Sequence, residues 1–238
     1  MADVNTQAVS DWSAFFREQA LICEDERLQL YYGAGCPAAD TPLSEIPFVA
    51  LDFETTGLDA GVDEIVSIGL VPFDLQRIRV REAKQWLLKP QQELHEQSVV
   101  IHGITHSDVN DAPDLNMVLG PLLEALSGRI VVAHYRYIER EFLDANVQRR
   151  IGEGIQFPIV DTMELEATLY RKRFSVFCSK LMGRKPTSIR LADSRTRYGL
   201  PHYGSHDALV DAIATAELLQ AQIRHRYSED TPIKDLWL

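Results

Sequence analysis

Three strand-like segments lie close together in the first half of the chain, and strand-like and helix-like segments alternate after them. The first three are Phe48–Leu51, Glu64–Val71 and Ile78–Leu88, each of strand length and separated by short turn-like stretches. Neighbours of this kind pair as antiparallel strands, whereas the later alternation is typical of parallel strands joined by helices. The order therefore predicts an α/β fold, a mixed sheet flanked by helices.

The second half supplies the alternating elements. A helical pattern follows Asp111-Ala112-Pro113, where the aspartate can cap the helix and the proline can occupy its first turn, and it stops at Gly128. The elements expected after it are a strand over 129–133, a helix over 137–149, a strand over 157–160, a helix from about 162 and a final helix over 207–224.

The N-terminal part differs in pattern from the rest. Apolar side chains up to about residue 30 recur roughly at helical spacing, and a stretch rich in glycine and proline follows. We therefore predict an N-terminal helical extension and linker over 1–45, followed by one catalytic domain over 46–230. The extension's aromatic residues could contact a protein partner, although covering its own domain is the preferred interpretation. These residues are Trp12, Phe15, Phe16, Tyr31 and Tyr32.

Composition excludes several classes of protein. With 238 residues and 45% hydrophobic content, the chain can fill a core, but no apolar run approaches the roughly 20 residues that span a bilayer. The N-terminus has neither a basic nor an apolar signal region, and three widely spaced cysteines suggest neither a disulfide framework nor a zinc cluster. A cytoplasmic protein without a membrane segment is predicted.

Positive charge is concentrated in one segment. Residues 171–197 contain nine basic residues and one acid, or a net charge of +8, although the whole chain has a net charge of −11. The rest therefore carries −19, part of which would be neutralised if carboxylates cluster around divalent cations. The basic segment could contact phosphates, or it could be an ordinary solvated face.

Asp52-Phe53-Glu54 directly follows the first apolar segment. The two-residue period of a strand points both carboxylates to one face, and such oxygen ligands suit Mg²⁺ or Mn²⁺. Taken alone, the tripeptide is better explained as a solvated strand end that leads into a turn.

A second acidic pattern, His206 followed by Asp211, opens the final helix. On a regular helix the two would lie about 140° apart, so His206 is expected on the preceding loop. Asp211 would then point inward from an apolar helix and need a partner.

Together these patterns resemble the DEDDh family of 3′-to-5′ exonucleases, which includes the proofreading subunit of bacterial DNA polymerase III. The resemblance covers about residues 46–225. It is carried by the strings FVALDFETTGL, VVIHGIT, VVAHYRYIEREFL, FPIVDTMEL and SHDALVDAIATAELL, in the expected order.

The resemblance implies a ribonuclease H-like fold and a catalytic site that holds two divalent cations, Mg²⁺ or Mn²⁺. The metal ligands carry over to Asp52, Glu54, Glu139 and Asp211, and His206 matches the general base. The second motif departs from the family, which has an asparagine after the histidine and an aspartate four residues later. This chain has Tyr135 and Glu139 there. The extra methylene could alter metal preference, although activity is still expected.

The resemblance also suggests contacts to the substrate. Thr56, Gly57 and Leu58 match the loop that approaches the terminal nucleotide, and His102 and Ile104 match its second wall. Ordinary explanations also exist: Gly57 could be a turn glycine, and Leu58 and Ile104 could be core residues. His102 could be a hydrogen-bonded structural histidine.

The basic segment supplies further candidates. Arg184, Lys185 and Arg190 are expected to contact phosphates without reading bases. Asp161 also matches the family but is left out of the metal site, because capping the following helix explains it.

The predicted function is removal of nucleoside 5′-monophosphates from 3′ ends of single-stranded nucleic acid, with DNA favoured. An RNA-trimming exonuclease of the same family is one alternative, since contacts to the 2′-hydroxyl are unknown. A non-catalytic module that binds nucleic acid or docks a partner is another, with Glu139 marking a degraded metal site.

Overall fold

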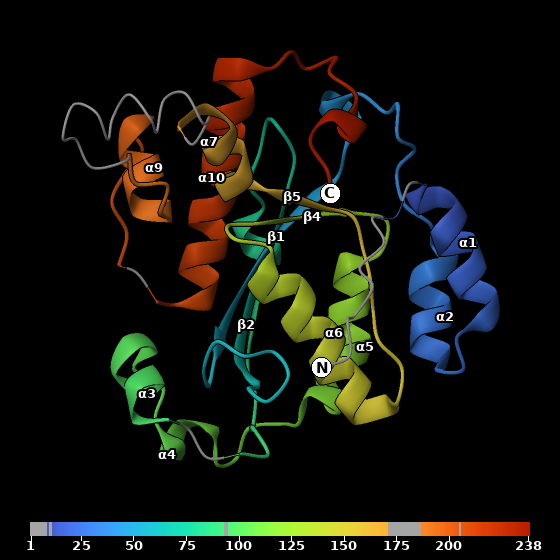
Figure 1. The fold of residues 1–238 in the computed structure, drawn as a ribbon, viewed down its shortest axis with the longest axis vertical. Helices are drawn as coiled ribbons and strands as arrows, with labels where there is room; N and C mark the ends of the chain where they lie inside the picture. Colours follow the sequence, from blue (N-terminus) through green and yellow to red (C-terminus); the bar gives the residue numbers. More distant parts are fainter. Residues whose placement is uncertain (1–8, 10, 93–94, 171–186, 205) are drawn as a thin grey trace, which may run out of the picture.

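The computed structural model describes residues 9, 11–92, 95–170, 187–204 and 206–238. At its centre is a five-stranded sheet in the order β3-β2-β1-β4-β5 (Figure 1). The antiparallel neighbours are β1 (Phe48–Thr55), β2 (Ile65–Phe73) and β3 (Lys84–Leu87). Two further strands, β4 (Ile130–Ala133) and β5 (Ile159–Asp161), run parallel to β1. The predicted mixed sheet is confirmed.

Helices cover both faces of the sheet, because β1 alternates its apolar side chains between two cores. Phe48 and Ala50 belong to the cluster that includes Ala212, whereas Val49 and Leu51 belong to the other cluster. The first face is covered by α10 (Ala208–Arg226) and α7 (Thr162–Tyr170), with α9 (Leu191–Arg197) against α10. The second face is covered by α5 (Leu115–Leu126) and α6 (Tyr137–Ile151).

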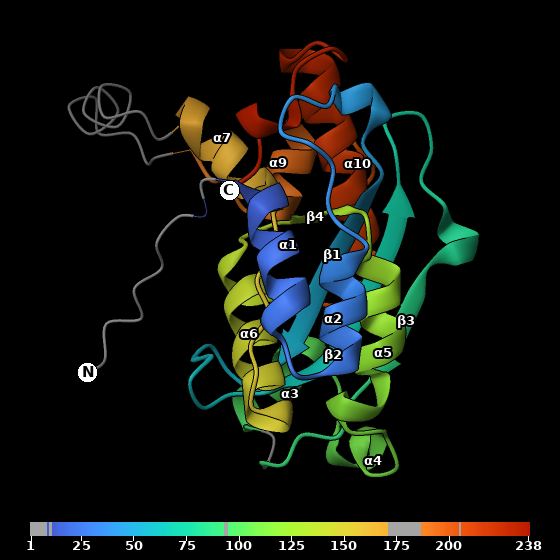
Figure 2. The same cartoon turned by 90° about the vertical axis from the view of Figure 1, so that its right-hand side faces the viewer.

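The N-terminal extension forms two helices, α1 (Trp12–Ile22) and α2 (Glu26–Gly33), on the side of α5 and α6 (Figure 2). One helix was expected up to about residue 30, but Cys23 has extended backbone and Asp25 caps a second helix. Trp12 and Phe16 are buried in the same cluster as Val49. The aromatic side chains considered for partner docking are thus largely occupied within this chain.

Several boundaries differ from the sequence predictions. The third strand was expected to begin at Ile78, but residues Val80–Glu82 form a 3₁₀ turn in which Val80 is exposed. Asp114, and not Asp111, accepts the capping hydrogen bond of α5. Two short helices, α3 (Glu96–His102) and α4 (His106–Val109), were not predicted. Among the helices of the described ranges, none is long and apolar enough to cross a membrane.

Candidate active site

The end of β1 carries two carboxylates on the face that α10 covers. Asp52 and Glu54 continue the alternation of Phe48 and Ala50, so they point to the same side of the sheet as those two residues. Asp52 pairs with Gly69 of β2 in the antiparallel register. The sequence pattern therefore places both acids beneath the first turn of α10.

Gly69 allows α10 to approach this closely. A Cβ atom at Gly69 would lie 2.2 Å from the backbone carbon of Ala208 and 2.3 Å from the backbone nitrogen of Leu209. These atoms belong to the helix backbone and cannot move aside as a flexible side chain would. The absent side chain thus sets the distance between the sheet and the start of α10, and sequence reasoning missed this residue. A glycine inside a strand is a known signal of close backbone approach.

Replacing Gly69 with alanine is therefore expected to displace the start of α10 and Asp211 with it. We expect nucleotide release to fall at least about a hundredfold, because misplacement by about 1 Å can have that effect. The matched control is Gly33→Ala, since no atom lies within 4 Å of the position of its added Cβ. Rates of nucleotide release check the prediction, and a Gly69→Ala enzyme with normal rates would contradict it.

Asp211 and His206 are held together at the beginning of α10. Asp207 caps the helix by accepting hydrogen bonds from the backbone N–H groups of Leu209 and Val210. His206 precedes this cap, as the sequence predicted, with a φ of 70°, and its backbone N–H donates to the Asp211 carboxylate at 2.8 Å. One ligand atom each from Glu54, His206 and Asp211 lies within 4.8 Å of the others.

Glu139 reaches the site from the first turn of α6 and is 2% exposed. Asp161 fixes the segment before this turn by accepting from the backbone N–H groups of Tyr135 and Arg136. It also accepts from the N–H of Met163, so it caps α7, as expected. Tyr135 has a φ of 88°, a conformation that asparagine tolerates better than tyrosine does and that costs about 1 kcal/mol or more. The departure from the family asparagine thus strains the backbone.

Burial and mutual repulsion make the four acids hard to ionise together. Burial, followed by repulsion from Glu139, raises the pKa of Asp52 well above its usual range. The same two causes, with Asp211 as the charged neighbour, raise the pKa of Glu54 to about 7. Burial also raises the pKa of Glu139 and of Asp211. A nearby positive charge would therefore be needed to ionise all four carboxylates at neutral pH.

The metal-free protein is expected to lose stability as the pH rises from about 4.5 to about 7. In this window the folded state binds more protons than the unfolded state, because the Glu54 pKa is raised from 4.5 to about 7. The stabilising contribution of Glu54 is complete below its unfolded pKa of 4.5 and is lost as the pH rises through its folded pKa of about 7. Thermal unfolding in chelator across this range checks the sign, and a melting temperature that rises with pH would contradict it.

The donor set fits divalent cations. Glu54, Glu139, Asp52 and Asp211 offer only carboxylate oxygens, the ligands that Mg²⁺ and Mn²⁺ prefer. Oε2 of Glu139 is buried and has no hydrogen-bond partner among the described residues. A buried carboxylate oxygen without a partner is costly unless a proton or a cation compensates it. These four residues could hold the metal.

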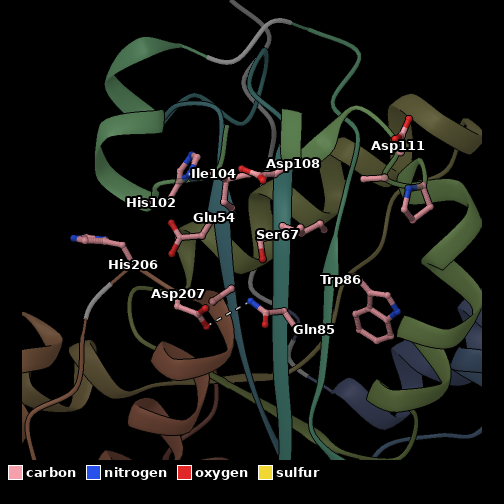
Figure 3. A pocket seen from close by; sticks show the side chains of 14 residues that line it. Glu54, Ser67, Gln85, Trp86, His102, Ile104, Asp108, Asp111, His206 and Asp207 are labelled. Atoms are coloured by element: carbon pink, nitrogen blue, oxygen red, sulfur yellow. Dashed lines mark hydrogen bonds between the residues drawn. The ribbon is translucent and has the colours of Figure 1, made fainter. Parts of the chain in front are cut away.

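Two cavities meet at His206. The larger cavity has a volume of about 700 Å³, and Glu54, His102, Ile104 and His206 are among its lining residues. Figure 3 shows Glu54 between His102 and Asp207. The structure thus brings His102 and Ile104 into the same cavity as Glu54 and His206. The smaller cavity, of about 390 Å³, is lined by His206, Asp211 and residues of the α9 region.

The predicted loop after β1 is only partly available to a ligand. The Thr56 hydroxyl donates to Asp63 and accepts from the N–H of Glu64, so it is used within the protein. A Cβ at Gly57 would lie 2.4 Å from the Asp63 carboxylate, which explains this glycine by close packing. Leu58 is 80% exposed and is therefore not a core residue.

The basic candidates fall into two groups. Arg190 is exposed at the start of α9 and lines the smaller cavity, whereas Arg184 and Lys185 lie outside the described residues. Two further residues that line the cavities were not predicted from the sequence. Ser67 lines the larger cavity with a buried hydroxyl that has no partner in the described part of the chain. Tyr203 lines the smaller cavity, and no sequence pattern marked either residue.

Comparisons with known proteins show the family of the chain and its fold. Residues 49–219 match the family model described as "Exonuclease". A DNA polymerase III PolC-type protein of Thermotoga petrophila is 32% identical over 179 residues, which make up 75% of this chain but 12% of that protein. The DNA polymerase III subunit epsilon of Treponema pallidum is 28% identical over 78% of this chain and 80% of its own length. The chain thus spans about an eighth of the PolC-type relatives.

Solved structures share the fold at lower identity. The nuclease domain of 3′hExo, a DEDDh family member bound to rAMP, has a TM-score of 0.61 and 16% identity over 76% of this chain and 92% of that one. Exonuclease I of E. coli with a dT13 oligonucleotide has a TM-score of 0.57 and 15% identity, over 76% and 42% of the two chains. These structures show that the chain has the fold of a DEDDh nuclease, and the chain belongs to the exonuclease family, as its sequence predicted.

Proposed function

We propose that this protein hydrolyses phosphodiester bonds at 3′ ends of single-stranded nucleic acid, DNA in preference to RNA, and releases nucleoside 5′-monophosphates. The observation that carries the proposal is that Glu54 and Asp211 lie close to His206 beside a cavity of about 700 Å³, with Asp52 as a buried carboxylate that Glu139, Asp211 and Glu54 repel. The acids come from three separate segments: β1, α6 and α10. Because their mutual repulsion destabilises the protein, a role that requires them is the simplest explanation.

Asp52, Glu54, Glu139 and Asp211 would hold two divalent cations. When bound, such a pair activates an attacking water and stabilises the departing 3′ oxygen. His206 takes the proton of that water as the general base. Its backbone N–H, bonded to Asp211, fixes the position of the imidazole relative to the carboxylates. His102 and Ile104 form one wall for the terminal nucleoside, and the exposed side chain of Leu58 forms another.

A frayed or single strand is favoured because the terminal nucleotide must enter a cavity as a separate unit. The names of two relatives, DNA polymerase III PolC-type and DNA polymerase III subunit epsilon, favour DNA. Arg190, together with Arg184 and Lys185, would contact phosphates of the bound strand. Residues 46–230 act as the exonuclease domain, and α1 and α2 of the extension cover its α5 and α6 side.

The test is digestion of a 5′-labelled single-stranded DNA oligomer and of the matched RNA, with Mg²⁺, Mn²⁺ or chelator. Stepwise shortening from the 3′ end that needs metal and is faster on DNA is the expected result. Faster shortening of RNA would support the RNA-trimming alternative. No shortening of either substrate with either metal would reject the proposal in favour of a binding module.

A further inference from the structure

Tyr203 is an exposed aromatic residue that the protein holds rigidly beside the acid cluster. It is 43% exposed, and its hydroxyl donates to Glu217 at 2.9 Å. The guanidinium of Arg195 lies over its ring, 4.6 Å from the ring centroid. The hydroxyl group and one face of the ring are thus held in place, and Tyr203 is among the lining residues of the smaller cavity. A ring held in this way can stack on a ligand with little further ordering cost.

Arg195 is itself held in place by burial and by several hydrogen bonds. It is 3% exposed, and its guanidinium donates to the carbonyl oxygens of Ala214 and Pro201 and to the Glu217 carboxylate. The ion pair with Glu217 compensates its charge. Arg195 therefore serves as a support for the Tyr203 ring and does not offer a free cation to a ligand.

The smaller cavity opens onto the point where hydrolysis is proposed. Its lining includes His206 and Asp211, and the larger cavity also reaches His206. If the proposed hydrolysis occurs there, the terminal nucleotide would lie in one cavity and the adjoining nucleotide in the other. The volume of about 390 Å³ is of the size that a small ligand unit fills.

The charged residues that line the two cavities indicate which cavity suits the continuing strand and which suits the terminal nucleotide. Four carboxylates line the larger cavity: Glu54, Asp108, Asp111 and Asp207. Asp211 is the one carboxylate among the described lining residues of the smaller cavity, where Arg190 and His202 are exposed. The guanidinium of Arg190 makes no hydrogen bond or ion pair with any described residue. The continuing strand, with its row of phosphates, is therefore better placed in the smaller cavity.

We propose that the smaller cavity is a subsite for the penultimate nucleotide, whose base stacks on Tyr203 while Arg190 and His202 contact its phosphate. This inference rests on the proposed function for the direction of the strand. Stacking on an aromatic ring does not depend on base identity, so the subsite gives affinity without sequence preference. It also requires an unpaired base and so selects single-stranded ends.

A double-mutant cycle between protein and ligand tests the contact. A short 5′-fluorescein oligothymidylate is compared with one that has an abasic residue at the penultimate position, and a third with the abasic residue further from the 3′ end is the control. Dissociation constants are measured by anisotropy in Ca²⁺ for the native chain, Tyr203→Ala and Tyr203→Phe. Melting temperatures check that the variants fold.

The native chain and Tyr203→Phe, which keeps the ring, are expected to bind the penultimate-abasic strand about tenfold more weakly than the intact one. Tyr203→Ala is expected to bind the intact strand about tenfold more weakly and to lose nothing further with the abasic strand. If Tyr203→Ala still bound the penultimate-abasic strand about tenfold more weakly than the intact strand, the subsite would be overturned. Absence of binding by the native chain would also overturn it.

Parallel digestion with Mg²⁺ separates this proposal from the proposed function. Coupling between Tyr203 and the penultimate base without any hydrolysis would retain the subsite and reject the exonuclease activity. Hydrolysis without coupling would reject the subsite alone.

Discussion

Replacing Asp52 with asparagine is expected to reduce nucleotide release by at least about a thousandfold. Asp52 lies among the other acids, and burial together with repulsion from Glu139 raises its pKa. Metal charge is worth several kcal/mol to a hydrolytic transition state, and each 1.36 kcal/mol is tenfold in rate. Asparagine keeps the size of the side chain but removes the charge that would hold the cation. Steady-state release of nucleotides from a labelled oligomer measures the loss.

The same variant should show an opposite change in metal-free stability. Without one of the repelling carboxylates, the chain in chelator at neutral pH is expected to melt at a higher temperature than the native chain. The increase that Mn²⁺ gives the native chain should be lost. The matched control is Asp230→Asn, since Asp230 is exposed beyond the other end of α10. An Asp52→Asn enzyme with more than a tenth of the native rate would contradict the metal site.

Replacing His206 with asparagine is expected to lower the rate of hydrolysis by roughly 10²- to 10⁴-fold, the usual contribution of a general base. Asparagine is chosen because the φ of 70° at this position disfavours alanine, whereas asparagine tolerates it. The backbone hydrogen bond to Asp211 is thereby kept. Substrate affinity is expected to change little, so the loss should appear in kcat and not in KM.

A second variant distinguishes loss of the base from distortion. His206→Gly also accepts the left-handed backbone and leaves space, so added imidazole should restore part of its rate. His106→Asn is the matched control, because His106 is exposed on α4. Failure of imidazole to restore any activity, with KM raised in both variants, would mean that His206 positions the substrate and does not take the proton.

The sheet and its order of elements followed from local patterns. The two-residue alternation through Phe48, Ala50, Asp52 and Glu54 is a property of any strand, so the shared face of the two acids could be predicted without a structure. Likewise the spacing of His206 and Asp211 predicted a loop residue before a helical one, because five residues do not share a helix face.

Short and solvated elements could not be predicted in this way. Residues Val80–Glu82 looked like part of a strand, but they form a 3₁₀ turn with an exposed valine. α3 and α4 span seven and four residues, too few to show a helical period. The break between α1 and α2 depends on the cap that Asp25 supplies to one particular turn.

Sequence alone determined that the acids exist, which of them share a strand, and that a histidine stands before the last helix. Only the tertiary structure decided that they meet. The backbone of α10 lies against Gly69, Asp161 fixes the start of α6, and Arg195 supports Tyr203. The physical reason is that spacing along a chain records local geometry, whereas these contacts join segments far apart in sequence, whose distances are set by packing.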